Sequence, residues 1–362
     1  MSDISPHAQN SPLLEVRDLS TSFRTEHGTV HAVDEVSFIL ERGQTLGVVG
    51  ESGSGKTVLS RSVMGLLPKR NVIREGSVLY EGTEIIGFNE KQMSDVWGAE
   101  MAMVFQDPMT SLNPVMKIGK QITESLRRHL GVDKDEATAT ATSLLRQVGI
   151  PEPERRLNEY PHQLSGGMRQ RVTIAIALAC GPKILFADEP TTALDVTVQA
   201  QILDLLDDLQ RDRHMAMILV SHDLGVVASR TDDIMVMYGG KVVEKAPTKE
   251  LFGNVKMPYT ESLLKSIPRI EQPSHTRLDA IPGRPPNLLS PPPGCNFAPR
   301  CRYVQQRCLT EEPPLEPAGD HAWRCWYPVG SDANREALER NLAAGVPVGV
   351  PAPGSMASAG DR

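Results

Sequence analysis

The stretch from Gly50 to Thr57, GESGSGKT, is the feature that most constrains the fold of this chain. It has the complete G-x-x-x-x-G-K-[ST] spacing of a loop that wraps around phosphate groups. The apolar run at 44–49 comes directly before it and predicts a buried strand, and 58–64 directly after it predicts a helix. This order of strand, loop and helix favours a phosphate-binding site over a chance glycine-rich turn.

Each residue type in this phosphate loop has a physical role. Glycines allow backbone conformations in which successive N–H groups point at phosphate oxygens, and the helix N-terminus adds partial positive charge. Lys56 is expected to reach the β- and γ-phosphates of a nucleotide, and Thr57 to place its hydroxyl on Mg²⁺. The predicted nucleotide contacts in the loop are Gly50, Ser52, Gly53, Ser54, Gly55, Lys56 and Thr57.

A second segment, KILFADE at 183–189, is an apolar run that ends in two carboxylates. A buried parallel strand has this pattern, and it delivers its acidic residues at the carboxyl end, where ligands bind. We expect Asp188 to organise Mg²⁺ and Glu189 to polarise an attacking water molecule. The alternative is a strand that is capped by solvated acids.

A third segment, LSGGMRQR at 164–171, predicts another anion-binding helix start, with the helix running over 168–179. Ser165 can cap that helix, while Gly166 and Gly167 let backbone amides approach an anion closely. One chain rarely needs two such starts for one nucleotide. The economical interpretation is that this loop serves the γ-phosphate held by another subunit.

Length and charge narrow the function classes. A chain of 362 residues suits one large or two modest domains, and a net charge of −7 argues against nucleic acid as the main partner. No apolar run reaches the 18 residues of a membrane span, and no secretory signal is visible at the N-terminus. We therefore expect a cytosolic protein whose membrane role, if any, comes through a partner.

Proline divides the chain. Of the 28 prolines, 16 lie within 268–353, and this density excludes long helices and central strands there. Residues 1–250 are therefore expected to form a regular α/β core and 251–330 a different, smaller unit. The remainder, 331–362, predicts a disordered tail with a short helix at about 335–344.

Four of the five cysteines lie in the proline-rich part, at Cys295, Cys301, Cys308 and Cys325. Their spacings differ from the C-x₂-C pairs of common zinc sites, and disulfides are disfavoured in a reducing cytosol. Zinc, an iron–sulfur cluster and unligated thiols remain open, with His321 as a competing ligand or a packing residue. Cys180 lies in an apolar run and is expected to be a packing residue.

From 13 to about 250 the chain resembles the nucleotide-binding subunit of an ABC transporter. His222 follows a predicted strand at 216–220, and alone it would be an ordinary strand-end histidine. The positions that match the family's motifs, in the family's order, are the Walker A loop at Gly50–Thr57, the Q-loop glutamine Gln106, the signature motif at Leu164–Gln170, the Walker B aspartate Asp188, the catalytic glutamate Glu189, the D-loop aspartate Asp195 and the switch histidine His222.

The resemblance implies an α/β P-loop NTPase fold with a RecA-like core, an antiparallel β-subdomain and a helical subdomain at about 107–165. It implies a head-to-tail dimer that holds two ATP molecules between Walker A and signature motifs. His222 would contact the γ-phosphate, and Gln106 would sense Mg²⁺ and the attacking water. Phe23 would stack on adenine, although a core role is the alternative. Helices predicted at 118–130 and 135–148 would dock membrane subunits.

Finer matches narrow the family. DPMTSLNP at 107–114 and the methionine at position 168 resemble dipeptide and oligopeptide permease ATPases of the D type, which pair with a different F-type ATPase. The segments 283–288 and 293–301 resemble the small C-terminal extension of these proteins, which implies a 4Fe–4S cluster on the four cysteines. ATPases of nickel, opine or glycoside importers and non-transport ABC ATPases remain alternatives.

The resemblance also implies partners and a location. The partners are a second ABC ATPase in a heterodimer, two transmembrane permease subunits and, through the complex, an extracytoplasmic peptide-binding protein. The location is the cytoplasmic face of the bacterial inner membrane, where the chain would be peripheral.

Overall fold

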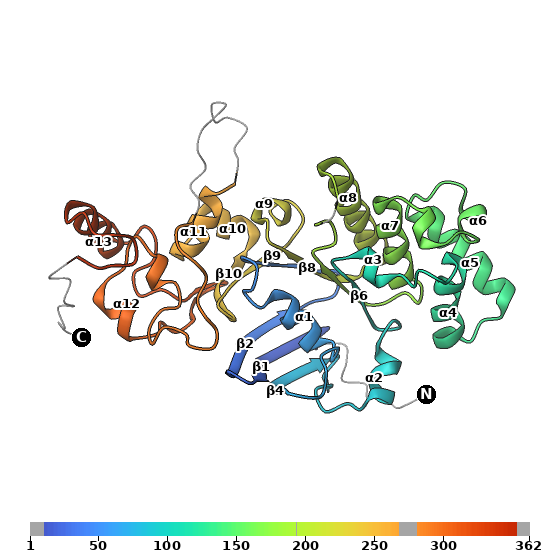
Figure 1. Cartoon of the computed structure of the whole chain (residues 1–362), viewed down its shortest axis with the longest axis horizontal. Coiled ribbons are helices and arrows are strands. Elements are labelled where there is room, and N and C mark those ends of the chain that lie inside the picture. The colour runs from blue at the N-terminus through green and yellow to red at the C-terminus, as the bar shows by residue number, and fades with distance from the viewer. Residues whose placement is uncertain (1–10, 193, 268–280, 353–362) are drawn as a thin grey trace.

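The computed structural model describes residues 11–192, 194–267 and 281–352. Two sheets organise it, a long mixed sheet and a smaller antiparallel one beside it (Figure 1). The smaller sheet has the order β2-β1-β4-β5. Its strands are β1 (Leu14–Thr25), β2 (Gly28–Leu40), β4 (Val72–Tyr80) and β5 (Thr83–Glu84).

The long sheet has the order β11-β12-β10-β9-β3-β8-β7-β6. Its centre is parallel, and every residue of β3 and of β7 is buried, which is why their sequences are continuous apolar runs. The strands predicted at 44–49, 183–189 and 216–220 are present, with bounds that differ by at most one residue at each end. The central strands are β3 (Thr45–Val49), β6 (Met101–Val104), β7 (Ile184–Asp188), β8 (Ala216–Ser221) and β9 (Asp233–Tyr238), with β10 (Lys241–Pro247) antiparallel to β9.

A group of helices lies at one end of the long sheet, on the right in Figure 1. Buried Ile118, Ile122 and Leu126 recur at helical spacing on one face of α4 (Ile118–Leu130), and the predicted bounds of this helix are confirmed. The prediction at 135–148 differs by one residue at each end from α5. The other helices here are α3 (Pro108–Ser111), α5 (Lys134–Gln147), α6 (Pro153–Arg156), α7 (Gly166–Ala177) and α8 (Val196–Arg213).

Shorter helices complete the core. They are α1 (Lys56–Val63) at the end of β3, α2 (Glu90–Val96), α9 (Leu224–Val227), α10 (Thr248–Gly253) and α11 (Pro258–Lys265). None of the described helices combines the length and the hydropathy that a membrane crossing needs.

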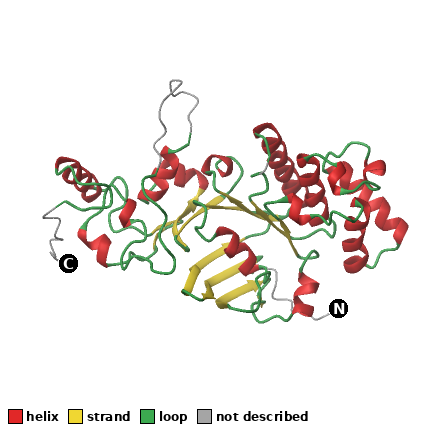
Figure 2. Ribbon diagram, viewed as in Figure 1, coloured by secondary structure: helices red, strands yellow, loops and turns green. Residues whose placement is uncertain are grey.

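The proline-rich C-terminal part, here called the extension (281–352), lies at the opposite end of the long sheet and consists mostly of loops (Figure 2). It is not separate from the core. Its strand β12 pairs antiparallel with β10, so the extension continues the core sheet across the predicted boundary at residue 250. Its elements are α12 (Gln306–Thr310), β11 (Glu316–Ala318), β12 (His321–Trp323) and α13 (Asp332–Ala343).

The segment from 331 to 352 was predicted to be a mostly disordered tail, but the structure describes it as ordered. Helix α13 begins at the cap residue Ser331, earlier than the predicted start, and buries Ala337 and Asn341 against the extension. Asn341 Nδ2 donates to the carbonyls of Arg302 and Val304, both at 3.1 Å. This long-range contact, which composition does not reveal, orders the helix. Residues 353–362 lie outside the described residues.

Candidate active site

The phosphate loop lies between β3 and α1, at the carboxyl edge of the parallel strands. Gly50 and Gly55 both have positive φ, at 154° and 104°. A Cβ on Gly50 would lie 2.2 Å from the carbonyl oxygen of Met237, and one on Gly55 would lie 2.3 Å from that of Ala32. Only glycine fits at these two positions, because neighbouring backbone occupies the space of a side chain.

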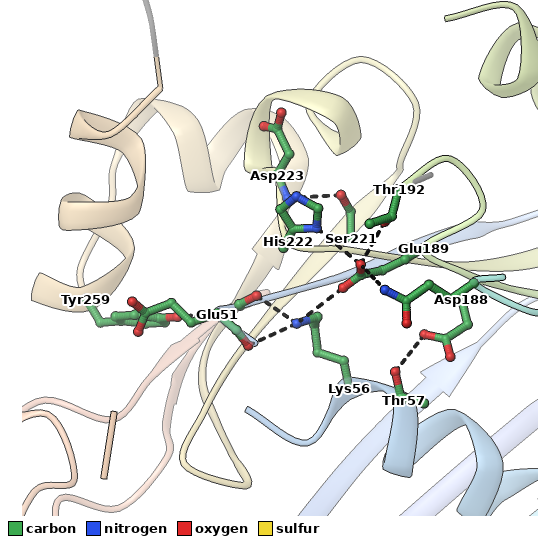
Figure 3. A network of polar contacts seen from close by, with 12 residues as sticks. Glu51, Lys56, Thr57, Asp188, Glu189, Thr192, Ser221, His222, Asp223 and Tyr259 are labelled. Carbon is green, nitrogen blue, oxygen red and sulfur yellow. Dashed lines mark hydrogen bonds and ion pairs between the residues drawn. The ribbon is translucent and has the colours of Figure 1, made fainter. Parts of the chain in front are cut away.

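Lys56 points back into the loop, where it is almost entirely buried. Its Nζ donates to the carbonyls of Gly50, at 2.7 Å, and Glu51, at 3.0 Å, and lies 3.9 Å from Glu189 Oε1 (Figure 3). Burial lowers the pKa of Lys56, and the nearby carboxylates of Glu189 and Asp188 oppose that shift. The loop therefore holds a desolvated ammonium at the place where phosphate oxygens would lie.

Two buried oxygens at this site have no hydrogen-bond partner among the described residues: Ser54 Oγ and Asp188 Oδ2. The other oxygen of Asp188 accepts from the Thr57 hydroxyl at 2.9 Å. Burial raises the pKa of Asp188, which the Thr57 hydrogen bond partly offsets. An orphaned carboxylate oxygen beside a threonine hydroxyl is a donor set that fits Mg²⁺, and the orphaned serine hydroxyl fits a phosphate oxygen.

Glu189 is the point on which the polar contacts converge. It follows β7 with a positive φ of 45°, a conformation that costs energy for a residue with a side chain. Its Oε2 accepts from Gln106 Nε2 at 3.0 Å and from the Thr192 hydroxyl at 2.8 Å, and lies 3.2 Å from His222 Nδ1 (Figure 3). The strained backbone aims one carboxylate at three polar side chains and Lys56.

These groups line one open cavity of about 460 Å³, a volume within the usual range of small-molecule sites. The structure therefore brings together the predicted residues Lys56, Thr57, Gln106, Glu189 and His222, and Asp188 lies directly behind Thr57. Phe23 does not line this cavity; it lies half-buried on β1, and its contact with adenine stays a prediction.

Thr192 is a site residue that the sequence motifs do not indicate. Its spacing of three residues from Glu189 is the only local signal. Only the turn that follows β7 brings the two side chains into hydrogen-bond contact.

The signature segment lies outside this cavity. Ser165 caps α7 as predicted, accepting at 3.3 Å from the Met168 N–H, and Ser165 and Gly166 are exposed. A Cβ on Gly167 would lie 2.8 Å from Val198 of α8. Asp195, also exposed, caps α8 by accepting from the Val198 N–H at 3.0 Å. These residues form an exposed surface beside α8, and their contact with a nucleotide stays a prediction.

The four cysteines of the extension line a separate small cavity of about 20 Å³, roughly the space of one water molecule. Burial raises the pKa of all four thiols, to about 12 for Cys295. None forms a disulfide. In the described part of the chain, no three His, Cys, Asp or Glu side chains are grouped closely enough to hold a metal ion, so the predicted cluster is not supported.

The alternative role of His321 as a metal ligand is not supported either. His321 is buried, and its Nε2 lies 2.8 Å from Oε1 of the fully buried Glu244. The carboxylate of Glu244 also accepts from the backbone N–H groups of Lys256, at 2.6 Å, and Met257, at 3.2 Å. The histidine is therefore part of a buried polar contact between β12 and the core.

Comparisons with known proteins agree with this geometry. The sequence profile of a family described as ABC transporter matches residues 33–192, and one described as oligopeptide/dipeptide transporter, C-terminal region, matches 243–308. The chain is 50% identical to the oligopeptide transport ATP-binding protein OppD of Bacillus subtilis, over 87% of this chain and 88% of that protein. It is 48% identical to the dipeptide transport ATP-binding protein DppD of the same organism, over 87% and 94%.

Solved structures give the same picture for the core. A dimeric, post-hydrolysis structure of the ATP-binding cassette MJ0796 bound to ADP and Pi superposes with a TM-score of 0.59 at 25% identity. It covers 65% of this chain and 98% of that one.

Proposed function

The chain belongs to the ABC transporter ATPase family, and on that premise we propose that it energises a membrane importer of dipeptides or oligopeptides. The peptide cargo is supported by the similarity to peptide transport ATP-binding proteins, and by a C-terminal region of the peptide-transporter type. The observation that carries the chemistry is Glu189, which faces Lys56, Gln106 and His222 at the mouth of the phosphate loop.

In the proposed reaction, the loop amides and Lys56 hold the β- and γ-phosphates of ATP. Thr57, Asp188 and Gln106 would hold Mg²⁺, which would neutralise phosphate charge when bound. Glu189 accepts a hydrogen bond from water and takes up one of its protons as the water oxygen bonds to the γ-phosphorus and the bond to the ADP oxygen breaks. That proton then passes to the phosphate product or to solvent. His222 contacts the γ-phosphate; its exposed ring and its contact with Glu189 support this role.

A second ATPase subunit completes each nucleotide site in this proposal. Ser165, Gly166, Gly167 and Asp195 of this chain face the nucleotide held by that subunit. The exposure of Ser165, Gly166 and Asp195, and the separation of all four residues from this chain's own cavity, support the assignment. The methionine at position 168 favours a heterodimer with an F-type ATPase over a homodimer.

The complex also contains two transmembrane permease subunits at the cytoplasmic face of the inner membrane, and an extracytoplasmic peptide-binding protein. The helices between Gln106 and Ser165 dock the permease subunits. Exposed apolar Met109, in α3, and Val115, in the loop that follows, support a protein contact there.

In this proposal the four cysteines are the ligands of a 4Fe–4S cluster, with a zinc ion as the alternative. All four thiols line one cavity, which supports this proposal. Because that cavity is only about 20 Å³, binding requires the thiols to lose protons and the cavity to enlarge around the cluster. Anaerobic purification tests this point. A brown protein with absorbance near roughly 400 nm and bound iron is expected. A colourless protein that carries zinc, or no metal, contradicts the cluster.

Two experiments test the transport function. Detergent extraction of the tagged chain is expected to recover two polytopic membrane proteins and a second ATPase. Deletion of its gene is expected to abolish growth on defined dipeptides or oligopeptides as sole nitrogen source. Loss of growth on nickel, opine or glycoside substrates, with peptide growth unchanged, would instead assign it to a related importer.

A further inference from the structure

We propose that Arg300 is a positioning residue for the phosphate loop, through which the C-terminal extension sets the nucleotide affinity of the core. Arg300 lies far along the chain from that loop, yet it contacts Glu51, the second residue of the loop. The inference rests on the nucleotide site proposed above, because Glu51 acts only through that site.

The contact is a two-pronged ion pair. Arg300 Nη1 donates to Glu51 Oε2 at 2.5 Å, and Nη2 donates to Oε1 at 2.9 Å. The arginine side chain is 3% exposed and the glutamate 27%. A paired fork of this kind fixes direction as well as distance, and burial on the arginine side limits screening by water.

The remaining donors of Arg300 anchor it away from the loop. Its Nε donates to the Pro282 carbonyl at 2.8 Å, Nη1 to the Tyr238 hydroxyl at 3.2 Å and Nη2 to the Ile281 carbonyl at 3.4 Å. Each of the five guanidinium N–H groups therefore has an acceptor. The guanidinium therefore links backbone carbonyls of the extension to the side chain of Glu51 in one fixed geometry.

The backbone N–H of Glu51 is also held by a residue that packs against the extension. This N–H donates at 2.8 Å to the hydroxyl of Tyr259, which lies in α11 and is entirely buried (Figure 3). The ring of Tyr259 packs against Tyr238 and against Phe297 of the extension, with centroid distances of 4.4 and 5.4 Å. The side chain of Glu51 is thus held by Arg300 of the extension, and its N–H by Tyr259, which packs against the extension.

The backbone carbonyl of Glu51 links these contacts to the lysine of the phosphate loop. That carbonyl accepts from Lys56 Nζ at 3.0 Å. A shift of Glu51 therefore moves an anchor of the lysine that faces the phosphates. Arg300 directly precedes Cys301, which lines the cysteine cavity, so we expect a change in that cavity to shift Arg300 as well.

The simplest competing explanation is that the ion pair only attaches the extension to the core. In that case its loss lowers the stability of the fold and leaves nucleotide affinity unchanged. The test therefore measures ADP affinity by calorimetry on the full chain, because ADP engages the loop and is not hydrolysed. Thermal unfolding of each variant is measured alongside.

Arg300→Met is expected to raise the ADP Kd by about tenfold, within the range of typical coupling between sites. Arg300→Lys keeps the charge without the fork and is expected to give a smaller rise. Glu51→Gln is expected to raise the Kd as well, and the double variant Glu51→Gln/Arg300→Met no further than the larger single effect. In the assembled transporter, the ATP KM is expected to rise with kcat within about twofold.

Arg302→Met is the matched control, since Arg302 lies in the same segment and its guanidinium has no ion pair or hydrogen bond among the described residues. Its ADP Kd is expected to stay within about twofold of the parent. A folded Arg300→Met protein with unchanged ADP Kd overturns the proposal, as does a double variant whose effects add.

Two further variants distinguish a failure of the Arg300 proposal from a failure of the nucleotide-site assignment. Should Arg300→Met not fold, Tyr259→Phe removes only the hydroxyl that receives the Glu51 N–H, and is expected to raise the Kd severalfold; an unchanged Kd overturns the proposal. Lys56→Ala tests the nucleotide site itself. ADP binding that survives this change contradicts the site assignment, and the role of Arg300 with it.

Discussion

At the scale of single residues, the backbone conformation of Glu189 is the feature that bears most on the proposed chemistry. Its φ of 45° is unusual for a residue with a side chain, and the polar groups around its carboxylate hold it there. Strain of this kind persists only where surrounding contacts determine the conformation, and it is concentrated at functional sites. The proposed role of Glu189 in activating water follows from this placement beside the phosphate loop.

Replacing Glu189 with Gln is expected to leave ATP binding intact and to lower turnover by about 100-fold or more, since the amide is a poor proton acceptor. The Gln amide keeps the size of the side chain and a hydrogen-bonding oxygen. Release of phosphate from ATP measures the effect, and ATP binding by calorimetry is the control. Unchanged hydrolysis would remove Glu189 from the proposed chemistry.

Asp188→Asn is expected to stabilise the nucleotide-free protein by about 1 kcal/mol at neutral pH, because it removes a buried charge that has an unpartnered oxygen. The raised pKa of Asp188 fixes the sign. As pH falls through that pKa, the native carboxylate takes up a proton, so the advantage of the amide is lost. Urea unfolding at several pH values measures this.

Asp133→Asn is the matched control for that series. Asp133 is exposed and caps α5 by accepting from the N–H groups of Asp135 and Glu136, and asparagine caps equally well. Its free energy of unfolding is expected to change by less than about 0.5 kcal/mol at neutral pH. An Asp188→Asn protein that is less stable than the parent would contradict the desolvation argument.

Local sequence was informative for residues whose function depends on neighbours along the chain. The phosphate loop and the carboxylates that end β7 belong to short patterns, so sequence alone predicted Lys56, Asp188 and Glu189. The grip on Glu51 was not predictable, because Arg300 and Tyr259 come from distant segments and only folding brings them to the loop.

At the scale of elements, long periodic segments were predicted well and short ones were not. Buried Ile118, Ile122 and Leu126 define α4 by their spacing alone. Strands β11 and β12 have three residues each, too few for a period, and form because β10 offers an edge for pairing. The order of α13 was missed because the contacts that pack it are with segments far away in the sequence, although Ser331 caps its start locally.

Asn341→Ala tests the order of α13. It is expected to lower the free energy of unfolding by about 2 kcal/mol, because it leaves the carbonyls of Arg302 and Val304 without their partner. Chemical denaturation measures the change, with exposed Glu339→Ala as the control on the same helix. Equal stability of the two variants would indicate that this helix is not packed.

At the scale of the whole molecule, the chain has two separate regions that we propose to contact nucleotide. Its own cavity contains the phosphate loop, Glu189 and His222, whereas exposed Ser165 and Gly166 lie outside it. The extension lies at the opposite end of the long sheet from the helical group and contacts the loop through Arg300 (Figure 1). The sequence predicted these parts and placed a boundary at 250, and the pairing of β10 with β12 joins the two sides of that boundary.

The central claim is that each nucleotide lies between two ATPase subunits. The most direct measurement is the mass and ATP content of the Glu189→Gln chain, mixed with its candidate F-type partner and ATP, by native mass spectrometry. The account predicts a one-to-one dimer that retains two ATP molecules and is lost when Ser165 is replaced by Arg. A single chain that retains ATP without joining the partner or a second copy would contradict it.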